Sequence, residues 1–179
     1  MGQHYCLFDT AIGPCGIAWN ERGLTRLRLP ESSPTTTEKR LRATLGSPAP
    51  ATPPLPIEAA IAELQRYFAG ARIEFGSIVL DLPDVDAFHR QVYEAARSVA
   101  WGQTTTYGEL ARQAGAPQEA REVGQALGHN PCPIVVPCHR VLAAGNKPGG
   151  FSANGGVVTK LKMLAIEGAA VNHTPNLFG

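Results

Sequence analysis

The chain begins with short apolar segments separated by turns. Residues 4–9, 14–19 and 23–29 are rich in apolar and aromatic side chains, and turn residues at 13–14 and 21–23 separate them. Apolar runs of this length, bounded by turn residues, are typical of successive β-strands. The pattern predicts a meander of three short strands.

Loops, a short helix and one further strand are expected to follow. The pattern predicts a polar loop over 30–37 and a helix over 38–45. Residues 47–56 hold five prolines in ten, which predicts a loop or a stiff connector. Residues 77–80 are apolar again and are expected to close the small sheet. We place a domain boundary near residue 85.

The clearest helical period of this half lies over residues 57–71. Ile57, Ile61, Leu64 and Phe68 fall on one face at helical spacing, and polar residues occupy the other positions. An apolar stripe of this kind predicts an amphipathic helix packed on a core.

The second half of the chain is predicted to be mostly helical. Asp86 is expected to cap a helix whose buried stripe is Phe88, Val92, Ala96 and Val99. Two shorter helices are expected next, the first from a cap within 104–106 to residue 113 and the second over 118–128. The break at 115–117 contains glycine and proline, so the pair matches a helix-turn-helix.

The second of these short helices has an unusual number of small residues. It carries Ala120, Gly124, Ala126 and Gly128, with Arg121 near its start. A glycine inside a helix costs about 1 kcal/mol relative to alanine, so some other advantage must offset it. Two explanations stay open: close packing on a neighbouring helix, or a slim face that enters a narrow nucleic-acid groove.

Composition and charge exclude few functions. Hydrophobic residues are 44% of the 179 residues and charged residues 17%, a globular composition, with a net charge of +1. Residues 88–179 hold eight basic and five acidic side chains, against eight and ten in residues 1–87. This small asymmetry permits DNA binding by the second half without establishing it. With neither a signal segment nor an apolar run of membrane-spanning length, a cytoplasmic protein is expected.

The four cysteines, at 6, 15, 132 and 138, form no CxxC pair. A zinc ribbon or a thioredoxin-like site is therefore not expected. His4, Cys6 and Cys15 lie close in sequence, but their spacing matches no established zinc pattern. The simpler interpretation is that Cys6 and Cys15 are small core residues of the strands, and no metal site is predicted.

Residues 130–141 are the most informative stretch of the sequence. Prolines at 131, 133 and 137 surround an Ile-Val-Val run, which forbids a helix and predicts a buried extended segment that ends at Cys138. A cysteine attacks as the thiolate, so it needs a base, and the base needs an orienting group. His139 can be that base, and a carboxylate must come from elsewhere in the chain. A cysteine beside a histidine is weak evidence by itself, because most buried cysteines serve only as small hydrophobic residues.

The surrounding motifs resemble those of the O6-alkylguanine-DNA alkyltransferases. The resemblance rests on residues 130–141 and on 102–111, 120–124, 150–156 and 160–168, and it covers about residues 85–168. It implies an α/β (α+β) protein with two domains. Residues 1–85 would form a ribonuclease-H-like small sheet with helices and have no catalytic role. Residues 86–179 would form a helical, winged-helix-like domain that binds DNA and accepts the alkyl group.

The resemblance implies a catalytic role for four residues. Cys138 would accept the alkyl group in a single irreversible turnover, and His139 would take the thiol proton through a water. Glu167 would orient His139, which supplies the missing carboxylate. Asn130 would brace the active-site turn by hydrogen bonds.

The resemblance also assigns residues to the substrate and to the DNA. Tyr107 would donate a hydrogen bond to guanine N3, Phe151 and Ser152 would wall and bind the base, and Val141 would lie at the substrate. Arg121 would fill the space that a flipped O6-alkylguanine leaves in the duplex. The remaining residues expected at the minor groove of double-stranded DNA are Thr106, Ala120, Gly124, Gln125 and Gly128.

The same comparison with the family implies what the protein does not need. No cofactor, no membrane and no obligate protein partner are expected, and the protein would act as a monomer. O4-alkylthymine would be a second substrate.

Some positions depart from the family pattern. Position 151 is phenylalanine where many members have tyrosine, and Cys132 is an extra thiol that is either buried or a side target. The loops at 142–150 and 152–155 differ in length from those of some members, which leaves the preferred alkyl size open.

Two other functions remain as alternatives. One is a binding module that recognises the lesion or regulates transcription without chemistry, which the set of Cys138, His139, Glu167 and Tyr107 disfavours. The other is a cysteine hydrolase, which would leave the helix-turn-helix without a purpose.

Overall fold

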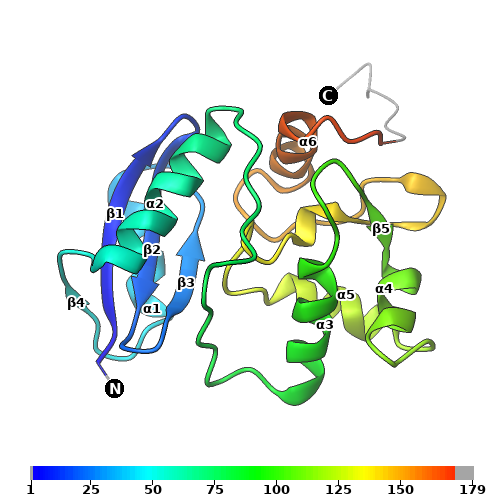
Figure 1. Cartoon of the computed structure of the whole chain (residues 1–179), viewed down its shortest axis with the longest axis horizontal. Coiled ribbons are helices and arrows are strands. Elements are labelled where there is room, and N and C mark those ends of the chain that lie inside the picture. The colour runs from blue at the N-terminus through cyan, green and yellow to red at the C-terminus, as the bar shows by residue number, and fades with distance from the viewer. Residues whose placement is uncertain (1, 172–179) are drawn as a thin grey trace. The chain divides into compact units, whose positions relative to one another are not determined.

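The computed structural model describes residues 2–171, which belong to two compact units. The first unit contains Met1–Asp86 together with Asn130–Val136, and the second contains Ala87–His129 and the chain from Pro137 onward. The mixed α/β fold that the sequence predicts is confirmed (Figure 1). The sequence predicted a single boundary near residue 85. It did not predict that Asn130–Val136 belongs to the first unit. Residues 172–179 of the predicted second domain lie outside the described residues.

The meander predicted for the start of the chain is confirmed. Strands β1 (His4–Thr10), β2 (Gly13–Trp19) and β3 (Leu24–Arg28) pair in antiparallel fashion, with Tyr5 opposite Ala18. The fourth strand of this sheet is β4 (Ala49–Pro50), which runs parallel to β1 and gives the order β3-β2-β1-β4. β4 lies within the predicted connector, and an edge position suits it because Pro50 has no N–H to donate.

The first helix begins earlier than the sequence pattern predicted. Helix α1 spans Pro34–Ala43, whereas residues 38–45 were expected. Ser33 caps it by accepting a hydrogen bond from the N–H of Thr36, and Pro34 stands in the first turn, where a missing N–H is harmless. The polar residues that suggested a loop are thus the first turn of the helix.

The second helix and the segment after it also differ from expectation. Helix α2 spans Leu55–Phe68, so it starts inside the proline-rich stretch and ends three residues before the predicted end. Residues 77–80 do not form a strand. One parallel bridge joins Leu24 to Leu80, with the Leu24 N–H 2.9 Å from the Val79 carbonyl oxygen.

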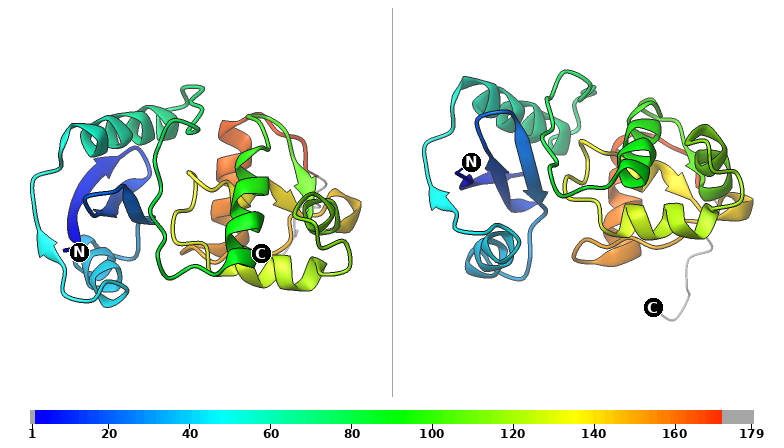
Figure 2. Two further views of the ribbon diagram at one scale, coloured as in Figure 1. Left: turned by 60° about the horizontal axis from the view of Figure 1, so that its bottom comes forward. Right: turned by 90° about the horizontal axis from the view of Figure 1, so that it is seen from below.

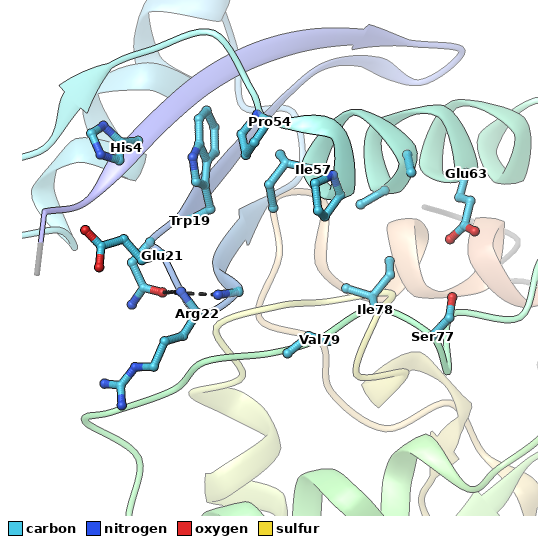
Figure 3. Close-up of a pocket in the computed structure, with 15 residues that line it drawn as sticks. His4, Trp19, Glu21, Arg22, Pro54, Ile57, Glu63, Ser77, Ile78 and Val79 are labelled. Carbon is cyan, nitrogen blue, oxygen red and sulfur yellow. Dashed lines mark hydrogen bonds between the residues drawn. The ribbon is translucent and has the colours of Figure 1, made fainter.

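The two helices cover opposite faces of the sheet (Figure 2). On one face, Tyr5 and Ala18 form a core cluster with Leu41 of α1 and with Leu45, which follows that helix. On the other face, Trp19 lies near the start of α2 (Figure 3). Because both faces are covered, every residue of β2 from Cys15 to Trp19 is buried.

The second unit contains the predicted helix-turn-helix. Helix α3 spans Ala87–Arg97, α4 spans Tyr107–Gln113 and α5 spans Ala120–Gly128. Gly115 has a φ of +79°, a conformation that suits glycine and turns the chain between α4 and α5.

In α3 the predicted stripe is only partly buried. Val92 and Ala96 are buried and Phe88 and Val99 are half-buried, while the core also includes Tyr93, whose hydroxyl donates to the Ala126 carbonyl at 2.7 Å.

Short elements complete the second unit. Strands β5 (Thr105–Thr106) and β6 (Val141–Leu142) form a parallel pair. Two 3-10 helices, η1 (Cys138–Arg140) and η2 (Ala144–Asn146), flank β6, and helix α6 spans Gly156–Ile166. Of the helices in residues 2–171, none has the length and apolar character needed to cross a membrane.

Candidate active site

The segment before Cys138 is a tight turn, and the prediction of an extended segment is wrong. The Val136 N–H donates to the Cys132 carbonyl at 2.9 Å, and Pro133 and Val136 form an isolated bridge. Between them, Ile134 has a φ of +75°, which a β-branched residue rarely adopts. The prolines do exclude a helix, but the chain satisfies its backbone by folding back on itself instead of extending.

Asn130 ties this turn together from inside. Its Oδ1 accepts from the Cys132 N–H at 3.0 Å, and its Nδ2 donates to the Val136 carbonyl at 2.9 Å. These bonds occupy both ends of the amide, so the side chain holds the turn in one geometry. Val136 stands two residues before Cys138, so this turn directly precedes η1 in the chain.

Cys138 opens η1 and lines a cavity of about 160 Å³ in the second unit. Its side chain is buried except for 6% of its surface. The residues around this cavity come from α4, α5, η1 and the loop before α6: Tyr107, Gly124, Leu127, Gly128, Cys138, Gly150, Phe151 and Ser152. Such a volume is below the roughly 300–1,000 Å³ typical of ligand pockets, so it suits one compact group.

The other three cysteines do not line this cavity. Cys15 is fully buried, and burial raises the pKa of its thiol to about 12. Burial also raises the pKa of half-buried Cys6. Cys132 is fully buried in the turn. Cys138 is the one described cysteine that lines the cavity, and this position makes it the candidate nucleophile.

His139 and Glu167 form a buried pair in the second unit. The Nε2 of His139 lies 2.5 Å from Oε2 of Glu167, and neither side chain is exposed. Glu167 follows α6 directly, as its C-cap residue. The sequence analysis expected a carboxylate from a distant part of the chain. Glu167, 28 positions after His139, places that carboxylate at the imidazole ring.

Burial and charge set the protonation states of this pair. Burial lowers the pKa of His139, although the hydrogen bond and charge of Glu167 oppose the shift. Burial opposes ionisation of Glu167, but the hydrogen bonds and charges of His139 and Arg140 outweigh it and keep the pKa of Glu167 below its usual value. At neutral pH the pair is therefore a neutral imidazole and a carboxylate. This combination can accept a proton and then stabilise the resulting imidazolium.

Arg140 is a part of the site that the sequence reasoning missed. Its Nε donates to Oε1 of Glu167 at 2.5 Å, and one of its terminal nitrogens donates to the Val99 carbonyl at 2.5 Å. Glu167 therefore binds His139 with one oxygen and Arg140 with the other. The adjacency of His139 and Arg140 in the sequence was a signal, but the shared carboxylate appears only in the fold.

Tyr107 occupies the first turn of α4 and forms one wall of the cavity. Its helix is capped by Thr106, whose hydroxyl accepts from the Glu109 N–H at 3.2 Å. A Cβ added at Gly149 would lie 3.2 Å from the phenol oxygen, so this loop glycine allows the close approach. Burial raises the pKa of Tyr107, and the negative charge of Cys138 adds to the shift. The phenol is thus protonated at neutral pH and available as a donor.

The loop after β6 brings two of the three other predicted substrate residues to the cavity. Phe151 is half-buried and Ser152 is exposed, and both line it. Val141 does not line the cavity. Its side chain is fully buried, and its carbonyl oxygen accepts from Nζ of Lys160 at 2.6 Å.

Most residues expected to bind DNA lie on the accessible side of α5, and one small residue does not. Arg121, Gln125 and Gly128 are exposed, and Ala120, Gly124 and Thr106 are half-buried. Ala126, which the sequence grouped with the small groove-facing residues, is fully buried and receives the Tyr93 hydroxyl. It belongs to the core because it lies on the opposite side of the helix from Arg121 and Gly128.

The glycines of α5 are not explained by tight helix packing. A Cβ at Gly124 would meet only the Tyr107 ring, at 3.8 Å, which is ordinary contact, and a Cβ at Gly128 would meet nothing within 4 Å. Both glycines line the cavity. Their absent side chains therefore keep space open between α5 and the approach to Cys138.

A larger hollow of about 670 Å³ lies in the first unit (Figure 3). Trp19, Pro54 and Ile57 form one side of it, and Ile78 and Val79 come from the segment after α2. The described residues that line it include no cysteine, so it offers no thiol nucleophile. Although this hollow is larger than the cavity at Cys138, the smaller cavity is the candidate active site because it contains the nucleophile.

No group of three or more histidine, cysteine, aspartate or glutamate side chains within residues 2–171 is arranged to hold a metal ion. This includes the neighbours His4, Cys6 and Cys15, whose spacing in the sequence matched no established zinc pattern.

Two family profiles match the chain. The profile of the 6-O-methylguanine DNA methyltransferase DNA-binding domain matches residues 87–169, and that of the ribonuclease-like domain of the same family matches residues 3–82. Together they span most of the chain.

Individual relatives agree with the profiles over nearly the full length. Methylated-DNA–protein-cysteine methyltransferase of Mycobacterium bovis is 39% identical over 164 residues, which is 92% of each chain. The protein of that name from Methanosarcina acetivorans is 32% identical over 93% of this chain and 99% of its own. The solved structure of Mycobacterium tuberculosis OGT in complex with DNA covers 92% of both chains, with a TM-score of 0.72 and 38% identity.

Proposed function

The chain belongs to the 6-O-methylguanine DNA methyltransferase family, and from this premise we propose that its alkyl acceptor is the sulfur of Cys138. The protein repairs DNA by direct reversal, through stoichiometric alkyl transfer from O6-alkylguanine to cysteine. The observation that carries the assignment is that Cys138 lines a cavity in the unit that also holds the buried His139–Glu167 pair.

The transfer is a displacement at the alkyl carbon. The Cys138 thiolate attacks the carbon attached to O6, so an S–C bond forms while the C–O6 bond breaks and its electron pair stays on guanine. The thiol proton leaves to His139, and guanine gains one proton in return. The products are an S-alkyl-cysteine and an intact guanine. Because a thioether has no easy route back to a thiol, each chain acts once.

The buried pair supplies the base. If the Nε2–H of His139 donates to Glu167, the basic nitrogen of the neutral ring is Nδ1, which takes the thiol proton through a water. Glu167 then stabilises the imidazolium, and Arg140 holds the carboxylate in place by its bond to the other oxygen. General-base assistance of this kind contributes about 10²- to 10⁴-fold to a rate.

The cavity walls bind the guanine. Tyr107 donates a hydrogen bond to N3, so the departing base need not carry a full negative charge. Phe151 offers a ring for stacking and Ser152 a hydroxyl for hydrogen bonding, both at the cavity. The glycines of α5 leave room for the base and its alkyl group.

DNA is the partner, and α5 is the element proposed to enter its minor groove. The O6-alkyl carbon lies within the stacked duplex, so the nucleotide must be flipped out, at a cost of a few kcal/mol. Arg121 is exposed near the start of α5 and is proposed to fill the vacated space. Gln125 and Gly128 lie on the exposed side of the same helix. We further propose, from the family resemblance, that the protein acts as a monomer.

The first test is intact-protein mass after incubation with a duplex that carries one O6-methylguanine, followed by peptide mapping. We expect a gain of one methyl group per chain, located on Cys138. Cys138→Ala should gain nothing, and Cys132→Ala should react as the parent protein does. An unchanged mass together with tight binding of the lesion would mean a recognition module, and the assignment of Cys138 would be withdrawn.

A further inference from the structure

The first unit contains a hollow that the proposed transfer does not use. It has a volume of about 670 Å³, within the roughly 300–1,000 Å³ typical of small-molecule sites. Every described residue that lines it belongs to the first unit, whereas Cys138 belongs to the second. The hollow and the cavity at Cys138 therefore share no lining residue.

Apolar side chains form most of the walls of this hollow. The lining residues of α2 run from 56 to 63, a distance of about 10 Å along a helix. Ala59 and Ala60 are small, so this face of α2 leaves space that larger side chains would fill. On the other side, Val79 keeps 64% of its surface exposed (Figure 3). A ligand that covers Val79 removes apolar surface from water, so the walls suit an apolar body.

The polar groups of the turn between β2 and β3 satisfy one another. Oδ1 of Asn20 accepts from the N–H of Arg22 at 2.8 Å, and its Nδ2 donates to Asp81 at 2.6 Å. The Nε of Arg22 lies 3.5 Å from the same Asp81 oxygen. The one guanidinium among the described residues that line the hollow is thus already ion-paired.

Two other polar atoms of the hollow are buried and have no hydrogen-bond partner within residues 2–171. They are Oε2 of Glu63 and Nδ1 of His4. Glu63 and His4 lie at opposite ends of the hollow in Figure 3, and the His4 ring is 6.2 Å from the Trp19 ring. Because buried polar atoms are nearly always paired, these two atoms indicate a ligand that carries hydrogen-bonding groups.

We propose that this hollow binds a small organic amine, with its ammonium group at Glu63 and its apolar body between α2 and Val79. A carboxylate only accepts hydrogen bonds, so the group beside Glu63 must be a donor. Glu21 brings a second carboxylate to the hollow while Arg22 is paired with Asp81, so the charge favours a cation. Binding of such an amine is a second property of the chain, and it does not depend on alkyl transfer.

The test uses 2-phenylethylamine as the probe and 2-phenylethanol as its uncharged counterpart. Each compound is titrated into the whole chain, labelled with nitrogen-15, and followed by proton–nitrogen NMR. We expect the amine to shift the amide signals of Ala60, Ser77 and Val79 and to leave those of α5 unchanged. A charge-assisted hydrogen bond is stronger than a neutral one, so the alcohol should bind about tenfold more weakly.

Two variants locate the amine in the hollow. Glu63→Gln keeps the size of the side chain but removes its charge and should weaken binding about tenfold. Glu58→Gln, at an exposed position of the same helix, should bind as the parent does. Ala59→Leu fills part of the hollow and should abolish binding, and Ala62→Leu, exposed and outside the hollow, is its matched control. Because Ala59 is exposed, its variant tests the proposal even if Glu63→Gln does not fold.

Several outcomes would overturn the proposal. Amide signals of the lining residues that stay in place at about 10 mM amine would show that the hollow is no amine site. Equal affinity for the amine and the alcohol, or equal amine affinity of the parent and Glu63→Gln, would show an apolar hollow with no preference for a cation. Shifts of the same signals with protein concentration alone would show that a second copy of the chain covers the hollow.

Discussion

Glu167 joins two other side chains of the site. It binds His139 through one oxygen and Arg140 through the other, and all three side chains are buried. The two contacts differ in consequence, because the contact with His139 can carry a proton whereas the guanidinium of Arg140 acts only as a hydrogen-bond donor. Glu167 therefore links proton transfer to a fixed ionic anchor.

Acid should destabilise the protein through this group of residues in two steps. The lowered pKa of His139 means that the unfolded chain takes up a proton first, so stability falls as pH drops below about 6.5. The lowered pKa of Glu167 adds a second loss as pH drops below about 4.3 and through its folded value. The measurement is the free energy of urea unfolding at several pH values from neutral to acid.

Variants divide this acid dependence between its sources. Glu167→Gln should be less stable at neutral pH and should lack the second loss. Glu109→Gln removes a carboxylate from the exposed ion pair with Arg112 and should keep the parent pH dependence. If the free energy of unfolding of the parent and of Glu167→Gln changed with pH in parallel, Glu167 would not be the source of the second loss.

Among the elements, α5 contains glycines that lower its helix stability and leave space in the cavity beside Cys138. Gly124 and Gly128 lie on its cavity side, and neither is needed for close packing. The two explanations that the sequence left open can therefore be separated, because the added Cβ positions meet open space or ordinary contact.

Replacing Gly124 by alanine should raise stability and hinder function together. We expect the free energy of unfolding to rise by up to about 1 kcal/mol, since alanine is the better helix former. The new methyl group would lie 3.8 Å from the Tyr107 ring and narrow the cavity, so transfer of a bulky O6-alkyl group should slow more than transfer of methyl. Thermal unfolding and single-turnover rates with two alkyl sizes measure both effects.

Gly108→Ala is the matched control for this prediction. Gly108 lies in helix α4, a Cβ there would meet nothing within 4 Å, and it does not line the cavity. Its replacement should leave both transfer rates unchanged. If Gly124→Ala slowed transfer of both alkyl sizes by the same factor relative to the parent protein, the glycine would not determine the space in the cavity.

At the scale of the whole molecule, the chain leaves the second unit and returns to it just before the nucleophile. Residues 130–136 belong to the first unit, where the Leu27 N–H of β3 donates to the Pro131 carbonyl at 2.9 Å. The turn is thus hydrogen-bonded to the sheet of its own unit. The first unit, which the family resemblance described as having no catalytic role, therefore contains the turn that precedes Cys138 in the chain.

Unfolding of the first unit should therefore abolish transfer. Trp19 is buried in β2 and, in a Trp101→Phe background, is the single tryptophan of the chain. We expect its fluorescence change and the loss of alkyl transfer to coincide in a urea titration, because Asn130–Val136 loses its anchor when the sheet unfolds. Activity that survives beyond the Trp19 transition would show that the second unit positions Cys138 unaided.

The sequence by itself determined the local periods and the chemical motifs. Three strands, the helix-turn-helix and the amphipathic α2 follow from side-chain spacing, because a strand or helix repeats its buried positions at a fixed interval. Cys138 and His139 stand adjacent, and family motifs named Glu167 and Tyr107 as their partners. The start of α1 was missed because Ser33 and Pro34 are turn residues and helix-start residues alike.

Only the tertiary structure decided what depends on contacts between distant segments. β4 needs β1 as a partner, the turn at 130–136 needs the Asn130 bonds, and Arg140 acquires its role from Glu167. Ala126 faces the core although its small side chain suggested a groove. In the sequence, nothing distinguishes Lys160 from the other lysine of this helix. Its burial beside two carbonyls arises because α6 packs on the segment that carries the nucleophile, and no local spacing records that contact.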